Sequence, residues 1–343
     1  MSAEDLLPTG AAISDAALRD EFTVRQVGPT ANPDFAFEVR VPRRWERLEM
    51  PGTDRAVSAE RLTPLSGWDD PAQRIGPMMF HVQAIGLPRE LSAEHLLMLH
   101  ALEARAELIA IRAPSATLSN GLMRLMIEGA PFLLRVAVFM DGDRAFFVTG
   151  MAPAEEYPDY ADTFAAMMST FRVTRPSPRR TVEPHVRRTL LDAIAFEAPA
   201  SFKALDAPGA TETHRAMDLF HRDPRGAFTG VIRVELDLGV AAPSADDDLA
   251  AVRRELERRG LEIEAVKSRE MDEGEGALVG RGFHVLHAKD AQGIPHEIPV
   301  SLLAVHGRPL RIWSLSRGRR FDFPSWAIHD RAFRVINDTL SIL

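Results

Sequence analysis

Residues 35–45 read Phe35-Ala36-Phe37-Glu38-Val39-Arg40-Val41-Pro42-Arg43-Arg44-Trp45. Its apolar residues alternate with polar ones at period two, which predicts a half-buried β-strand. Pro42 ends the strand because proline cannot donate to a sheet ladder, and Trp45 follows three positions later. A similar stretch, Ile194-Ala195-Phe196-Glu197-Ala198-Pro199-Ala200-Ser201-Phe202, keeps the same spacing between its proline and its aromatic residue. The repetition predicts one fold that occurs twice in the chain.

Further landmarks repeat in the same order at an offset that drifts. The pairs are Pro42 with Pro199 (199 − 42 = 157), Ser92 with Ser244 (244 − 92 = 152) and Phe164 with Phe333 (333 − 164 = 169). A drifting offset indicates two divergent domains with different loop lengths. It does not indicate a solenoid, whose period would be about 20–50 residues.

Length and composition agree with two soluble domains. The chain has 343 residues, which is long for a single core. We expect a mobile lead-in at residues 1–21, a first domain at 22–174, a Pro- and Arg-rich linker at 175–186 and a second domain at 187–343. The net charge of −8 argues against a nucleic-acid binder, and the absence of cysteine excludes disulfides and thiolate sites. With no signal peptide and no apolar run of about 20 residues, the expected location is the cytoplasm, without membrane insertion.

The order of the predicted elements defines the fold class. A helix opens at Ser92 and carries apolar residues on one face as far as Leu108. A hairpin turns at Asp141-Gly142, where positive φ is needed, and a closing helix spans residues 157–171. Residues 57–62 are predicted as a strand and 63–77 as a loop. The second copy repeats this order, so the fold class is α+β: two tandem domains, each an antiparallel sheet with helices packed on it.

No motif for catalysis, phosphate binding or metal binding is present. His284 and His287 are three apart on a predicted strand and point to opposite faces, so they cannot easily share a metal ion. The acidic run at residues 246–248 suits the positive end of a helix better than a cation site. We therefore predict no enzyme activity, no cofactor and no metal.

The apolar load of the late strands is the remaining unusual feature. Residues 132–140 are apolar on both faces, with Arg135 as the exception. Helices on both faces of the sheet would explain this pattern. The alternative is that one face is partly open as a groove for a partner. The residues predicted to form that hydrophobic binding surface are Leu133, Ala137, Phe139, Phe147, Trp68 and Trp313.

The layout resembles the PsbP-like group of α/β/α sandwich domains, which includes the DcrB-like proteins. The residues that carry the resemblance are Phe37–Pro42 with Trp45, the hairpin at Asp141-Gly142, the helix from Phe164 to Phe171, and in the second copy Phe196–Pro199, Phe202, Gly307 and Phe333. The resemblance implies a largely non-enzymatic protein. One cytoplasmic branch, the Eag chaperones of type VI secretion, forms homodimers that shield transmembrane segments of effectors. It implies here a monomer whose two domains mimic such a dimer, although single-domain members are the usual case.

These observations lead to one functional hypothesis and two rivals. The leading hypothesis is a non-catalytic, cytoplasmic protein-binding module, a secretion chaperone or adaptor that shields an apolar segment of a client. The second is a small-ligand binder or enzyme with a site between the domains, formed from Trp68, His81, His284 and Trp313. The third is a structural component of a larger assembly.

Overall fold

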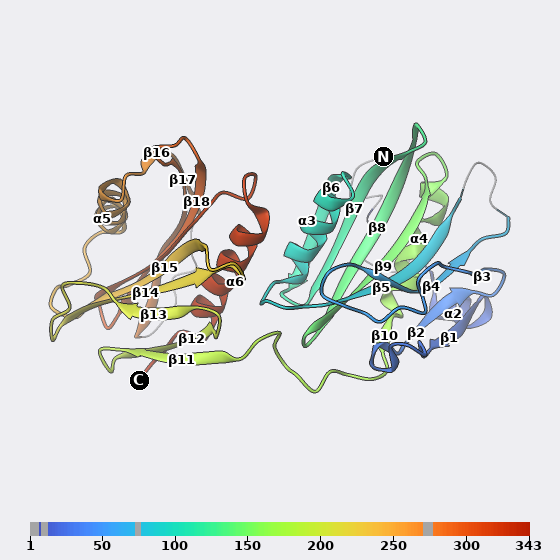
Figure 1. Ribbon diagram of the computed structural model, residues 1–343, viewed down its shortest axis with the longest axis horizontal. Coiled ribbons are helices and arrows are strands. Elements are labelled where there is room, and N and C mark those ends of the chain that lie inside the picture. The colour runs from blue at the N-terminus through green and yellow to red at the C-terminus, as the bar shows by residue number, and fades with distance from the viewer. Residues whose placement is uncertain (1–6, 8–12, 73–76, 270–276) are drawn as a thin grey trace. The chain divides into compact units, whose positions relative to one another are not determined.

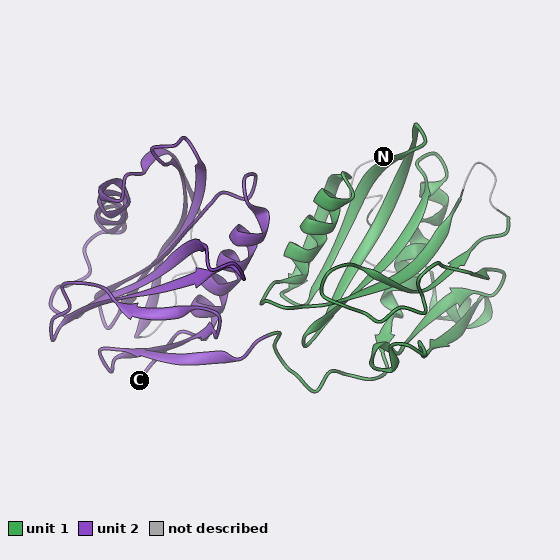
Figure 2. Ribbon diagram, viewed as in Figure 1, with its two compact units in different colours: residues 1–182 green, residues 183–343 purple. Residues whose placement is uncertain are grey.

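The computed structural model describes residues 7, 13–72, 77–269 and 277–343. The chain divides into unit 1, residues 1–182, and unit 2, residues 183–343 (Figure 2). Within the predicted lead-in, residues 1–6 and 8–12 lie outside the described part. Ser14 caps a short helix, α2 (Asp15–Asp20), by accepting a hydrogen bond from the Ala17 amide. The division falls inside the stretch predicted as a linker, and the predicted domain limits stay predictions.

Unit 1 is built on a seven-stranded antiparallel sheet in the order β3-β4-β5-β9-β8-β7-β6 (Figure 1). Its strands are β3 (Glu46–Leu48), β4 (Thr63–Asp69), β5 (Met79–Gly86), β6 (Glu107–Ser115), β7 (Leu118–Ile127), β8 (Ala130–Asp141) and β9 (Arg144–Pro153). A smaller antiparallel sheet joins β1 (Phe22–Val27), β2 (Phe37–Pro42) and β10 (Arg172–Val173).

One helix covers each face of the large sheet of unit 1. Helix α3 (Ala93–Glu103) lies over β6, β7 and β8, and α4 (Tyr157–Ser169) lies over β8, β9 and β2. Successive side chains of a strand point to opposite faces. Val136 and Val138 accordingly belong to the core under α3, and Ala137 belongs to the core under α4. Two helix-covered faces explain why β8 is apolar on both sides.

Unit 2 repeats this architecture. Its large antiparallel sheet has the order β13-β14-β15-β19-β18-β17-β16, and a small sheet has the order β11-β12-β20. Helix α5 packs on one face of the large sheet and α6 on the other. The elements are β11 (His185–Leu190), β12 (Ile194–Pro199), β13 (Lys203–Asp206), β14 (His214–Arg222), β15 (Phe228–Asp237), α5 (Ala245–Arg258), β16 (Glu262–Arg269), β17 (Leu278–Lys289), β18 (Pro295–Val305), β19 (Arg308–Ser316), α6 (Phe323–Thr339) and β20 (Ser341–Ile342).

Matching hydrogen bonds show that the two units are copies. The Arg40 amide donates to Thr170 Oγ1 at 3.0 Å, and the Glu197 amide donates to Thr339 Oγ1 at 2.9 Å. The turn after each first strand also repeats, because the amides of Trp45 and Phe202 each donate to the carbonyl of the preceding proline at 3.0 Å. The predicted α+β class with two tandem, helix-covered antiparallel sheets is confirmed.

Two local predictions were wrong. Residues 57–62 form no strand, whereas β4 lies in the Gly- and Pro-containing stretch predicted as a loop. Glycine suits position 67 of this strand because the Met50 side chain packs closely against it, and an added Cβ would lie 2.6 Å from Met50 Sδ. The first helix stops at Glu103 instead of reaching Leu108. Arg105 takes a positive φ of 54°, and β6 then begins at Glu107. Strands β6, β13 and β14 were not foreseen.

Residues 175–182 are bound to unit 1. The buried Arg144 side chain donates to the carbonyls of Asp34 and Arg175 and pairs with Asp141. The amide of Ser177 donates to Asp141 Oδ2 at 2.8 Å, and the amide of Val182 donates to Glu90 Oε2 at 3.2 Å. This segment is therefore a fixed strap on the β8–β9 hairpin, which we call the Arg144 strap.

Candidate functional site

The residues predicted as a hydrophobic binding surface are mostly buried. The exposed fractions are 7% for Leu133, 1% for Ala137, 3% for Phe147, 2% for Trp68 and 1% for Trp313. Phe139 is partly buried and packs on Phe171 with ring centroids 4.8 Å apart. These five buried side chains belong to cores that helices cover, namely α3 and α4 in unit 1 and α5, over Trp313, in unit 2. Their role in binding stays a prediction.

Two of the six predicted residues, Ala137 and Phe139, come together at a cavity in unit 1. The cavity has a volume of about 610 Å³, which lies within the range of small-ligand sites. It is lined by residues of β6, β7, β8 and α4 and by two outlying positions: Leu7, Arg112, Ala113, Pro114, Leu118, Asn120, Arg135, Ala137, Phe139, Ala165, Met168, Ser169 and Arg172. We call it the Arg-lined cavity.

The charge of this cavity is of one sign. Three of its lining residues are Arg112, Arg135 and Arg172, and the described lining residues include no aspartate or glutamate. Arg135 is 3% exposed, and its burial lowers the pKa of its guanidinium. It keeps its charge at neutral pH because the ordinary pKa of arginine is above 12. Positive charge beside apolar walls of low dielectric constant favours an anionic, partly apolar occupant.

The chain itself places one residue against this cavity. Leu7 is 1% exposed and packs in the core under α4. Its backbone carbonyl accepts a hydrogen bond of 2.7 Å from Nη1 of Arg112, which lies 105 positions further along the chain. An apolar side chain and a backbone carbonyl are what any extended peptide segment offers. The Arg112–Leu7 contact therefore seats one residue of the chain, by its side chain and its carbonyl together, at the cavity wall.

The matching position in unit 2 is filled. Asn120 pairs with Ala137 across β7 and β8, and Ala137 pairs with Val148. The same register in unit 2 runs from Phe283 to Ser301 to Ile312, so Phe283 takes the place of Asn120. The Phe283 ring packs on Phe333 with centroids 6.3 Å apart. Asn120 instead lines the Arg-lined cavity, and its buried Oδ1 has no hydrogen-bond partner among the described residues.

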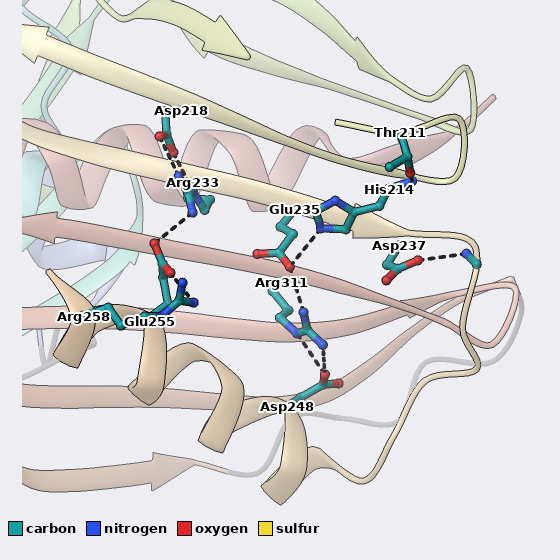
Figure 3. Close-up of polar contacts among 11 residues, drawn as sticks. Thr211, His214, Asp218, Arg233, Glu235, Asp237, Asp248, Glu255, Arg258 and Arg311 are labelled. Carbon is teal, nitrogen blue, oxygen red and sulfur yellow. Dashed lines mark hydrogen bonds and ion pairs between the residues drawn. The ribbon is translucent and has the colours of Figure 1, made fainter. Parts of the chain in front are cut away.

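Unit 2 carries a network of ion pairs on the face covered by α5 (Figure 3). Asp248, 1% exposed, accepts from Arg311 at 2.7 Å and pairs with Arg281. Arg311 also donates to Glu235 at 2.8 Å. Asp248 is therefore the buried carboxylate shared by Arg281 and Arg311. It also lies in the first turn of α5, as the sequence predicted.

A second part of the same network covers Trp313. Arg233 pairs with Asp218 at 2.7 Å and with Glu255 at 3.1 Å. The guanidinium carbons of Arg233 and Arg259 lie 5.5 Å and 5.0 Å from the Trp313 ring centroid. Both guanidinium groups thus lie within cation–π distance of a ring that is 1% exposed.

The alternative site proposed for a small ligand divides between the units. Trp68 and His81 belong to unit 1, and His284 and Trp313 belong to unit 2. Burial and the charge of His100 lower the pKa of His81 to about 4, while His284 Nδ1 lies 2.9 Å from Ser268 Oγ. A site shared by the four stays a prediction.

Within residues 13–72, 77–269 and 277–343, no cluster of three or more His, Cys, Asp or Glu side chains is arranged to hold a metal ion. Over the same ranges, no helix is both long and apolar enough to span a bilayer.

No protein-family model and no curated protein matches the chain. Solved structures similar to it include a cyanobacterial PsbP from Synechocystis, 14% identical, with 49% of this chain and 98% of that one covered at a TM-score of 0.33. The type VI secretion immunity protein TplEi from Pseudomonas aeruginosa is 10% identical, with 94% and 97% covered at a TM-score of 0.23. Likenesses this remote leave function to be inferred from the chain's own residues.

Sequence reasoning found part of the Arg-lined cavity and missed the rest. Arg135 stood out as the one charge in an apolar strand, and that signal does mark the cavity. Arg112, Asn120 and Arg172 lie in strands that are not uniformly apolar, so a polar residue there does not stand out in the sequence. Leu7 lies in the predicted lead-in, where nothing local indicates burial.

Proposed function

We propose that the chain is a non-catalytic protein-binding module whose site is the Arg-lined cavity of unit 1. The observation that carries the proposal is the seating of Leu7, because it shows that the cavity wall accepts an apolar side chain together with a peptide carbonyl. A protein that covers an apolar segment of a client in this way acts as a chaperone or adaptor. The proposal keeps the cytoplasmic setting expected from the sequence.

The shape of the site supports a segment rather than a whole folded surface. The apolar walls come from residues 113, 114, 118, 137, 139, 165 and 168, and the arginines stand among them. Burial of an apolar side chain contributes about 1.5–3 kcal/mol. A charge-assisted hydrogen bond from arginine adds about 1.5–3 kcal/mol. One anchoring residue of a bound segment would thus supply much of a micromolar affinity.

The test uses peptides selected from a displayed random library against the full chain. Selected peptides are synthesised and their affinities measured by fluorescence anisotropy for wild type, Asn120→Phe and Arg112→Ala. We expect Asn120→Phe, which places the residue of unit 2 in the cavity, to abolish binding, and Arg112→Ala to weaken it about tenfold or more.

Arg124→Ala is the matched control, because Arg124 lies on β7 in an exposed pair with Glu107. It should bind like wild type. Peptides that bind all four proteins equally, or a library that returns no binder, would contradict the proposal.

The second candidate function is the binding of a small amphiphilic anion. A cavity of about 610 Å³ with three arginines and apolar walls also suits an alkyl chain that ends in a carboxylate. Titration calorimetry with dodecanoate separates the two. Binding of dodecanoate that is lost in Asn120→Phe, together with no peptide binder, would favour the small ligand.

A further inference from the structure

Leu7 lies against the Arg-lined cavity although it belongs to no described helix or strand. Its side chain is 1% exposed and belongs to the core that α4 covers. Its carbonyl is held by Arg112 at 2.7 Å. The same guanidinium lines the cavity, so Leu7 uses a group that a bound partner would also need.

The sequence around Leu7 matches the charge of the cavity. Glu4 and Asp5 precede Leu7, and the segment from Met1 to Ser14 contains no lysine or arginine. The cavity offers three arginines, with no carboxylate among its described lining residues. An acidic segment with one buried leucine is therefore complementary to this site in both charge and polarity.

We infer that Leu7 is an internal ligand of Arg112 at the wall of the Arg-lined cavity, and that the partner which displaces it presents the same chemistry. That chemistry is an extended segment with an apolar side chain close to acidic residues. The inference rests on the proposed function, since it names the partner and the control of the same site.

Competition between Leu7 and the partner follows from the shared contact with Arg112. A partner that takes over the Arg112 contact binds only the fraction of molecules in which Leu7 has released it, so its apparent affinity falls in proportion to that fraction. Removing the Leu7 side chain should raise the fraction without touching the partner's own contacts. Adding salt should lower the affinity of the partner for the cavity, because salt screens the attraction between its acidic residues and the arginines.

The experiment uses the full chain and two probes. The first probe is a labelled synthetic peptide with the sequence of residues 1–14, and the second is a peptide from the library selection. Binding of each is measured by fluorescence anisotropy to wild type and to Leu7→Ala. We expect Leu7→Ala to bind both peptides at least about fivefold more tightly than wild type.

Four controls accompany the measurement. Leu102→Ala removes a leucine that is 57% exposed on α3 and should bind like wild type. A probe peptide with its Leu7 position changed to alanine should not bind, and one with Gln and Asn in place of Glu4 and Asp5 should bind about threefold to tenfold more weakly. Circular dichroism confirms that Leu7→Ala remains folded.

The outcomes separate the inference from the proposed function. Equal affinities for wild type and Leu7→Ala, with binding still lost in Asn120→Phe, would overturn the inference and leave the protein-binding site in place. Loss of every dependence on Asn120 and Arg112 would overturn both. A probe peptide that binds regardless of its leucine or its acids would overturn the partner chemistry.

Discussion

The faces under α3 and α5 occupy matching places in the two copies, yet they are held together by opposite chemistry. Val82 pairs with Val148 in unit 1, and Val234 pairs with Ile312 in unit 2. Taking these pairs as equivalent, the neighbouring pair Gln83–Phe147 corresponds to Glu235–Arg311. One step the other way, His81–Thr149 corresponds to Arg233–Trp313.

The two helices differ as their faces do. Helix α3 buries Leu96, Leu97 and Ala101 against an apolar core. Helix α5 buries only Val252, Leu256 and Asp248 and joins the sheet through ion pairs. The same backbone arrangement thus accommodates either an apolar core or a set of ion pairs beneath its helix, because neither leaves an unfavourable group buried. Apolar groups leave water, and each described charge of the network that leaves water has a partner.

The largest effect on stability should come from removing a carboxylate from the ion pairs beneath α5. Replacing Asp248 by alanine leaves Arg281 and Arg311 without their buried carboxylate, and removing one member of a buried pair costs about 3–5 kcal/mol. We expect the free energy of unfolding of unit 2, measured by urea titration, to fall by that amount. Asp246→Ala, at an exposed position of the same helix turn, should change it by less than about 0.5 kcal/mol. Equal effects would mean that the network adds nothing particular to unit 2.

A pH titration distinguishes the copies at a matching helix position. Equating Thr170 with Thr339 (339 − 170 = 169) places His329 at the position of Tyr160 (329 − 169 = 160). Burial, with the charge of His221, lowers the pKa of His329 to about 3. The folded pKa of His329 lies below the unfolded value near 6.5. The contribution of the neutral, buried His329 to the free energy of unfolding is therefore fully present above pH 6.5. It is lost as pH falls toward 3.

The loss expected from His329 is about 3 kcal/mol at pH 4 relative to pH 7. Urea titrations at several pH values should show a flatter dependence for unit 2 in His329→Gln than in wild type. His306→Gln, at an exposed turn, should follow wild type. An unchanged slope in His329→Gln would show that another group titrates.

The smallest effects come from exchanging the residues at the cavity position. Phe283→Asn should lower the free energy of unfolding of unit 2 by about 2 kcal/mol, because a partly buried ring is lost from the core. Asn120→Phe should change that of unit 1 by no more than about 1 kcal/mol, since the ring enters existing space. Urea titration measures both. A large destabilisation by Asn120→Phe would show that the cavity cannot hold a ring.

The sequence predicted those parts of the fold that depend on local pattern. Period two marked β2 and β12, Asp141-Gly142 marked the β8–β9 turn, and the spacing of Phe164 marked α4. Strand β4 was missed because its glycine, Gly67, packs closely against Met50, and this contact cannot be seen from the residues next to Gly67 in the sequence. The C-terminal end of α3 depends on a positive φ at Arg105, a conformation that an arginine in the sequence does not predict.

The candidate site was harder to predict because its parts are far apart in the chain. Arg112 and Leu7 are separated by 105 positions, and Asn120 differs in role from Phe283 only through what α4 and α6 bring against them. Arg135 was visible because a charge in an apolar strand breaks the pattern locally. Pattern alone cannot tell whether such a charge lies beside a cavity or within a filled core.

The Arg144 strap has a practical consequence for cutting the protein into pieces. A fragment that ended at Thr174, the limit that the sequence indicates, would remove the Arg175 carbonyl and the Ser177 amide from their partners. Arg144 would keep its stacking on Phe35 and Phe146, at 5.2 Å and 5.8 Å, but would lose a hydrogen bond in a buried setting. Protease digestion of the whole chain should accordingly spare residues 175–182, so the shortest stable piece of unit 1 ends at Val182.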